Sequence, residues 1–252
     1  MRTMIQKGWR PALVLLLLFI LWELSSKLFE IPAWLLPSPS QIVQVGIEGW
    51  SSYQHHLIAT IILAIVGYTI GCLIGILVAS CLHLLPLVRE ACYPLIILSQ
   101  NIPIIVLAPL LVIWFGFGML PKVIIITLVC FFPIVVSALD GFAQTDRDMK
   151  HYMKMAGATR SQIFRKLEWP HALPSVFSGL KISATYSVMG AVIAEWLGAS
   201  EGIGVYMTLA SSSFRTDQVF VAIFLIMAIS LLFFACIKLL EKKLVKWKPE
   251  GS

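Results

Sequence analysis

The sequence has little charge. Only 13% of its 252 residues are charged, whereas a soluble domain carries about a quarter. Hydrophobic residues make up 59% of the chain and the mean hydropathy is +0.89. So much apolar surface cannot be hidden in a water-soluble core of this length. The composition therefore excludes an ordinary soluble globular protein and indicates that lipid is the solvent of most of the chain.

Motifs for several kinds of chemistry are also missing. The sequence contains no G-x-x-x-x-G-K-[ST] phosphate-binding loop, so the chain cannot bind ATP in that manner. The five cysteines form no C-x-x-C pair and the five histidines show no ligand spacing, so no metal site is predicted. The apolar runs hold no nucleophile with a base, which disfavours an intramembrane enzyme and leaves no candidate catalytic residue. No ring-forming acidic or filter-like motif supports a channel.

Six apolar stretches have the length of transmembrane helices, about 18–25 residues. They cover residues 11–29, 57–82, 96–115, 120–139, 174–197 and 219–240. The first is not followed by a small-residue cleavage site, so we interpret it as a retained helix rather than a signal peptide. The sequence thus predicts an all-α integral membrane protein whose residues 1–252 form a single transmembrane domain with six helices.

The basic residues predict the orientation. Of the nineteen Lys and Arg residues, only Lys27, Lys122 and Arg215 lie on the side opposite to the N-terminus. Loops rich in Lys and Arg stay inside, so both termini are predicted to be cytoplasmic. The net charge of +6 is explained in the same way, and no nucleic-acid partner is predicted.

The inner loop 143–173, between the fourth and fifth spans, has an ordered pattern. Asp146 or Asp148 can cap a short helix that ends at Gly157. Thr159 stands three residues before Gln162, as in a capping box that begins a second short helix. We expect Pro170 and Pro174 to end that second helix. From these residues alone, the pair of helices could dock on a protein or lie on anionic lipid.

Residues 156–170, AGATRSQIFRKLEWP, show a family pattern. The loop resembles the cytoplasmic "EAA" loop of binding-protein-dependent ABC importer permeases, whose pattern is E-A-A-x-x-x-G, nine residues, then I-x-L-P. Gly157 matches the glycine, Leu167 and Trp169 the apolar positions and Pro170 the proline. The E-A-A itself is absent, because His151, Tyr152 and Met153 occupy those positions.

Further matches extend the resemblance over nearly the whole chain. They include LPSPS at 36–40, FFPI at 131–134, SGLK at 178–181 and GIG at 202–204. The chain is similar to the branch of permeases that serve sulfonates, taurine, nitrate and thiamine-precursor pyrimidines. Residues 184–199 are most similar to permeases for the pyrimidines, so such a small organic solute is the expected substrate, with a sulfonate, taurine or nitrate-type anion as the alternative.

The resemblance implies a type I ABC importer (MetI-like) permease in the cell (inner) membrane. It implies a homodimer, two ATP-binding-cassette ATPase subunits that hold ATP and Mg²⁺, and an extracytoplasmic solute-binding protein. The loop 143–173, the coupling loop, would dock on the ATPase. Its implied docking residues are Met155, Ala156, Gly157, Ala158, Thr159, Ile163, Phe164, Leu167 and Pro170.

Polar residues inside the apolar runs are candidates for the solute pathway or its gate. Ser99, Gln100 and Asn101 interrupt the third span, where they either line the pathway or mark the start of the span. Ser183 and Ser187 share a face of the fifth span, suited to a pathway or to tight packing.

Glu195 is the one carboxylate near a span centre, and it lies toward the outer end. An ion-coupled secondary transporter would need such groups at mid-membrane, which makes it the rival class. The second span carries a small-residue stripe, Ala64, Gly67, Gly71, Gly75 and Ala79, which favours close helix packing within one subunit.

Overall fold

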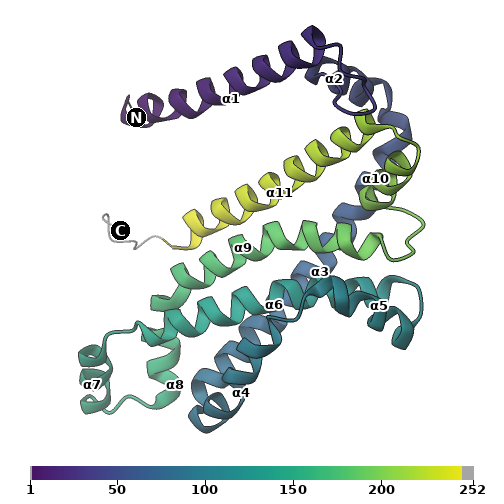
Figure 1. Cartoon of the computed structure of the whole chain (residues 1–252). Coiled ribbons are helices and arrows are strands. Elements are labelled where there is room, and N and C mark those ends of the chain that lie inside the picture. The colour runs from purple at the N-terminus through teal and green to yellow at the C-terminus, as the bar shows by residue number, and fades with distance from the viewer. Residues whose placement is uncertain (1, 246–252) are drawn as a thin grey trace.

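The computed structural model (Figure 1) describes the backbone of residues 2–245 and the side chains from residue 9 onward. The side chains of Arg2 and Lys7, and residues Lys246 and Lys248, which support the predicted orientation, lie outside this part. All regular structure in the described residues is helical, as predicted. The first six helices are α1 Arg2–Leu28, α2 Pro39–Glu48, α3 Trp50–Leu84, α4 Pro86–Ser99, α5 Ile104–Phe115 and α6 Met119–Ala143. Then follow α7 Arg147–Met155, α8 Arg160–Ile163, the π-helical turn η1 Phe164–Glu168, α9 Trp169–Glu195, α10 Ile203–Ser212 and α11 Thr216–Leu244.

Five segments are long and apolar enough to cross a membrane, and a sixth is broken. The predicted span 96–115 is not one straight helix, because α4 and α5 meet at an angle of 99°. Pro103 has no N–H for a helical hydrogen bond, and it adopts an extended backbone before α5. At the end of α4, the Ser99 hydroxyl donates to the Ile96 carbonyl (2.9 Å). The helix α4 therefore ends at Ser99, and residues 100–103 connect it to α5.

The core is formed by α3, α6 and α9; α6 and α9 run side by side in the centre of Figure 1, and α3 crosses them. The glycine stripe of α3 faces α6, as its spacing predicted. A Cβ at Gly67 would lie 2.5 Å from the Ile126 side chain, and one at Gly71 would lie 2.8 Å from Cys130. The stripe therefore brings two backbones of the same subunit close together, which confirms the packing prediction.

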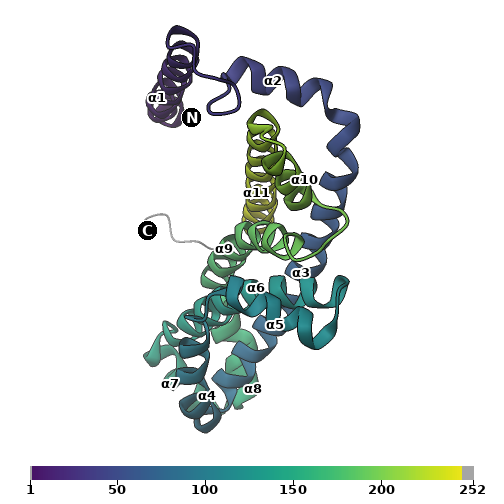
Figure 2. The same ribbon diagram turned by 45° about the vertical axis from the view of Figure 1, so that its right-hand side comes forward.

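The segments that join the first predicted span to the second and the fifth to the sixth contain helices. Ser38 caps α2, with Pro39 in its first turn, so the LPSPS stretch begins a helix after a turn. The segment 198–218, after the fifth span, contains α10. In both views α1 lies apart from the core (Figures 1 and 2). Its carboxyl-terminal end is held by Trp22, whose ring packs on Phe220 (5.2 Å between centroids), and by Glu23, which accepts from the Ser40 hydroxyl (2.7 Å).

The prediction that Pro170 and Pro174 end the second loop helix is wrong. Residues Arg160–Glu195 form 36 residues of continuous helical structure, about 54 Å long at the usual rise per residue. A π-helical turn precedes the first proline, because the Trp169 N–H donates to the Phe164 carbonyl five residues back instead of four. Pro170 then falls in the first turn of α9, where a missing N–H costs little. The second half of the coupling loop therefore continues directly into the fifth span.

Candidate functional site

Local capping builds the first half of the coupling loop. Asp146 caps α7, since its Oδ1 accepts from the N–H groups of Asp148 (2.8 Å) and Met149 (3.3 Å). The predicted capping box is present: Thr159 Oγ1 accepts from the Gln162 N–H (3.3 Å), and the Gln162 side chain accepts from the Thr159 N–H (2.8 Å). Between them Gly157 has φ +81°, a left-handed conformation that favours glycine. The two predicted helices and the turn at Gly157 are confirmed.

The structure divides the nine predicted docking residues into two groups. Met155, Ala156, Gly157 and Thr159 are exposed at the tip of the loop, with Ala158 half-buried beside them. Ile163 is buried, and Phe164, Leu167 and Pro170 are half-buried. The Phe164 ring packs on both Phe142 (5.4 Å between centroids) and Trp169 (6.1 Å). The second group therefore anchors the loop on the membrane domain, and the tip is its most exposed part.

An apolar ridge on α7 adds to that tip. Met149, Tyr152 and Met155, three residues apart, have exposed fractions of 48%, 66% and 70%. Residues at this spacing lie on one face of a helix. Met149 and Tyr152 were not among the predicted docking residues, although the M-x-x-Y-x-x-M spacing within a capped helix indicated a shared face. The ridge extends the exposed surface of the tip along α7.

A buried carboxylate holds α7 in place. Glu168 in η1 accepts from Lys150 Nζ on α7 (2.8 Å) and is paired with His83 Nε2 at the end of α3 (2.8 Å). Only 8% of Glu168 is exposed. One side chain thus joins the coupling helix, the second span and the helix that leads into the fifth span. Sequence reasoning did not single out Glu168, because His83 is 85 residues away along the chain.

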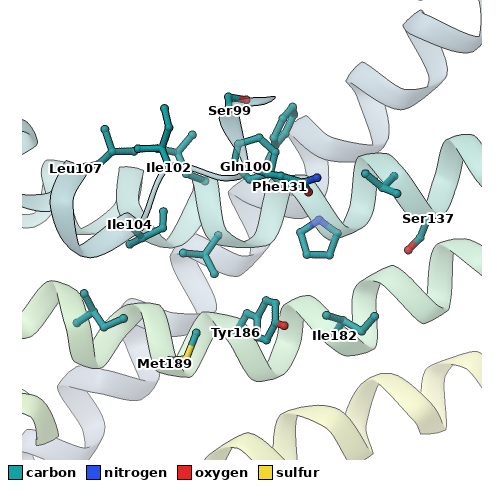
Figure 3. A pocket seen from close by; sticks show the side chains of 16 residues that line it. Ser99, Gln100, Ile102, Ile104, Leu107, Phe131, Ser137, Ile182, Tyr186 and Met189 are labelled. Atoms are coloured by element: carbon teal, nitrogen blue, oxygen red, sulfur yellow. The ribbon is translucent and has the colours of Figure 1, made fainter. Parts of the chain in front are cut away.

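A cavity of about 790 Å³ lies between the α4–α5 break, α6 and α9 (Figure 3). Ser99 and Gln100 line it, as the pathway prediction requires. Asn101 is not among its lining residues, and its side-chain amide donates to the Ile97 carbonyl instead (2.9 Å). The break in the third span therefore brings two of its three polar residues to a solute-sized space.

The α9 wall of the cavity is a different face from the one predicted. Ile182, Tyr186, Met189 and Ile193 line the space. Ser183 and Ser187 are fully buried, and their hydroxyls donate to the carbonyls of Cys130 and Ala184 (both 2.8 Å). The pathway assignment of these two serines is thus corrected. Their small side chains let α9 pack closely on α6, the packing role that their spacing also allowed.

Glu195 is buried and serves as a structural acceptor. Its exposed fraction is 2%. Its carboxylate accepts from Thr60 Oγ1 on α3 and from the Gly204 N–H at the start of α10 (both 2.7 Å). Thr60 Oγ1 in turn accepts from the Ile203 N–H (2.8 Å). Glu195 is not among the residues that line the cavity; it belongs instead to a hydrogen-bond network that joins α3, α9 and α10.

Comparison with known proteins decides the family. The pattern of the binding-protein-dependent transport system inner membrane component matches residues 71–246, more than two thirds of the chain. The chain belongs to this family. It is therefore a permease subunit of an ABC importer and a multi-pass inner-membrane protein. Its family works with ATPase and solute-binding partners.

Full-length relatives agree with this assignment. The formylaminopyrimidine transport permease ThiX of Halalkalibacterium halodurans is 39% identical, over 95% of this chain and 96% of the relative. The riboflavin transport system permease RibX of Chloroflexus aurantiacus is 31% identical, over 93% and 88%. The taurine transport system permease TauC of Escherichia coli is 30% identical, over 94% and 88%. Their named solutes differ in kind, so family membership alone leaves the solute of this permease open.

Proposed function

We propose that two copies of this permease form the solute pathway, dock ATPase subunits through their coupling loops, and import a small ring-shaped solute of the thiamine-precursor pyrimidine kind. The observation that carries the docking proposal is the exposed tip at the end of a continuous helix. Met149, Tyr152 and Met155 expose an apolar ridge there, and the segment Arg160–Glu195 runs from that tip through the membrane. Through the turn at Gly157 the ridge is joined to this segment, so that movement of the docked tip would reach the fifth span along one helical path.

The solute proposal is supported by the relatives. The 39% identity to ThiX exceeds the 30% identity to TauC at almost the same coverage of this chain. A sulfonate, taurine or nitrate-type anion is the second candidate, since TauC also matches along nearly its whole length.

The test is uptake into proteoliposomes that contain the permease, its ATPase subunit and its solute-binding protein. We expect ATP-dependent uptake of formylaminopyrimidine that exceeds uptake of taurine. Preferred uptake of taurine would favour the anion candidate. Uptake driven by a proton gradient without ATP would instead support an ion-coupled secondary transporter and contradict the proposal.

Substitutions of Gly157 test the turn at the loop tip. A side chain there meets no atom within 4 Å, so any effect comes from the backbone at φ +81°. Gly157→Val is expected to cost about 1–2 kcal/mol in this conformation, to misplace α7, and to reduce both ATPase co-purification and uptake severalfold. Gly157→Asn is the matched control, because asparagine tolerates the left-handed region, and it is expected to retain most of both. Equal, unchanged uptake in the two variants would contradict the docking role of the tip.

Charge on the apolar ridge tests the docking surface. Met155→Asp is expected to weaken ATPase binding at least about tenfold, because a carboxylate would be desolvated where an apolar side chain is buried. Ser161→Asp adds the same charge to an exposed position of the same loop and serves as the control. Co-purification of the ATPase from detergent measures both. If the loop instead lay on anionic lipid, both charges would leave ATPase binding intact, and the proposal would fail.

A further inference from the structure

The walls of the cavity carry no formal charge. Within the described residues, none of the sixteen lining side chains is an Asp, Glu, Lys, Arg or His. Most of the lining residues are Ile, Leu, Val and Phe. The two helix ends that meet at the break, the carboxyl end of α4 and the amino end of α5, have opposite partial charges. No lining side chain therefore supplies a positive charge that would hold an anion.

The polar groups that line the cavity lie on opposite walls. Ser99 and Gln100 lie at the α4–α5 break, while Tyr186 projects from α9 on the other side (Figure 3). Ser137 on α6 is the fourth polar lining residue. No hydrogen bond within the described residues occupies the Gln100 amide or the Tyr186 hydroxyl. Tyr186 has an exposed fraction of 42% and Met189 of 48%, so both side chains are accessible. An amide offers a donor and an acceptor side by side, which suits the edge of a nitrogen heterocycle.

The uncharged, mostly apolar lining of the cavity favours a neutral solute over an anion. Moving a sulfonate or nitrate anion from water into an uncharged, mostly apolar space is unfavourable without a cationic partner. A flat, neutral ring loses little on leaving water and gains contact with an aromatic face. The volume of about 790 Å³ lies in the range of small-molecule sites.

We propose that this cavity is a solute-binding site of the permease itself, and that it takes an uncharged heteroaromatic ring stacked on Tyr186 with its edge hydrogen-bonded to Gln100. The inference deepens the proposed function, on which it rests. It assigns part of the selection against anions to the membrane subunit, in addition to any selection by the solute-binding protein.

Equilibrium binding of formylaminopyrimidine to the permease–ATPase complex in nanodiscs, without ATP or solute-binding protein, tests the site. Tyr186→Ala is expected to weaken binding about five- to tenfold, because the stacking surface is lost, while Tyr186→Phe restores most of it. Gln100→Ala is expected to weaken binding by a similar factor. Ile113→Ala is the control, because Ile113 is 75% exposed on α5 and does not line the cavity.

A charge placed in the wall tests the selection. Met189→Lys is expected to weaken formylaminopyrimidine binding and to create binding of a pyrimidine carboxylate, an anion of similar size that the unmodified permease rejects. Unmodified permease that binds the carboxylate as well as the neutral ring would overturn the inference.

The outcomes separate the inference from the proposed function. If ATP-driven uptake of formylaminopyrimidine persists but nanodisc binding is absent, or unaffected at Tyr186 and Gln100, the cavity is not the site and the proposed function stands. If no ATP-driven uptake of formylaminopyrimidine occurs, the proposed function fails first, and the inference fails with it. Binding that is lost in the two cavity variants and kept in Ile113→Ala supports both.

Discussion

Replacing Glu195 with alanine is expected to destabilise the permease by about 3–5 kcal/mol and to abolish uptake. The carboxylate is buried and accepts hydrogen bonds from Thr60 and from the Gly204 N–H. Alanine would leave the Gly204 N–H without an acceptor and would open a cavity between three helices. Thermal unfolding of the purified complex measures the stability change, and uptake into proteoliposomes measures function.

Glutamine at the same position separates structure from charge. In Glu195→Gln the amide oxygen can accept from the Gly204 N–H, and the amide nitrogen can donate to Thr60 Oγ1. The Thr60 hydroxyl can then turn to the His56 carbonyl, which lies 3.1 Å away. We therefore expect Glu195→Gln to retain most of the stability and uptake. A glutamine variant that folds normally but does not transport would show instead that the negative charge itself acts in gating.

Substitutions of two glycines test independently how closely Glu195 packs against the start of α10. Gly202 has φ +130°, and a Cβ there would clash with the Glu195 carboxyl group. Gly118 has φ +144° with no atom within 4 Å of such a Cβ. Gly202→Ala and Gly118→Ala thus share the backbone strain and differ in the clash. The larger loss of thermal stability expected for Gly202→Ala isolates the contact with Glu195, and equal losses would contradict its importance.

Local signals in the sequence predicted local structure well. The caps at Asp146 and Thr159 and the turn at Gly157 depend on residues within a few positions of one another, so spacing was enough. The close packing along Gly67, Gly71 and Gly75 was equally predictable, because residues four apart lie on the same face of a helix. The break at residues 99–103 was visible as polar residues before a proline. Its angle of 99° was not, since tertiary packing sets how two helices meet.

The candidate site was only partly predictable, because polarity does not say which side of a buried helix faces a cavity. Ser183 and Ser187 suggested one face of α9, yet their hydroxyls are satisfied by backbone carbonyls in the helix interface. The cavity face carries Tyr186 and Met189, which in sequence look like core or lipid-facing residues. Glu168 was missed for a related reason: its importance comes from a partner far away in the chain.

Loss of the Glu168 carboxylate is the other change with a large expected effect. Glu168→Leu keeps the apolar bulk but leaves Lys150 and His83 without their shared partner. We expect a loss of about 2–3 kcal/mol, less than the 3–5 kcal/mol of fully buried pairs because Lys150 keeps 24% of its side chain exposed. More importantly, α7 would no longer be tied to α3 and α9. The complex is then expected to hydrolyse ATP with little solute moved.

The ratio of solute imported to ATP hydrolysed in proteoliposomes measures this uncoupling. Glu168→Gln is expected to restore much of the ratio, because its amide can still accept from Lys150 and donate to His83. The matched control is Lys181→Met. Lys181 pairs with Glu241 at the same distance (2.8 Å) and ties α9 to α11 without contacting α7. That variant is expected to lose stability but to keep its transport ratio.

The comparison between the two ion pairs decides what Glu168 does. If Glu168→Leu and Lys181→Met lower stability alike and leave the ratio unchanged in both, Glu168 only supports the fold. A fall in the ratio confined to the Glu168 variant means that the carboxylate transmits movement of the coupling helix. Its position favours this result. Glu168 lies near the loop end of the 36-residue helical segment and Glu195 ends it, so two carboxylates fix both ends of that segment to α3. In the proposed mechanism, displacement of the docked loop would therefore move the cavity wall that carries Tyr186, which belongs to the same helical segment.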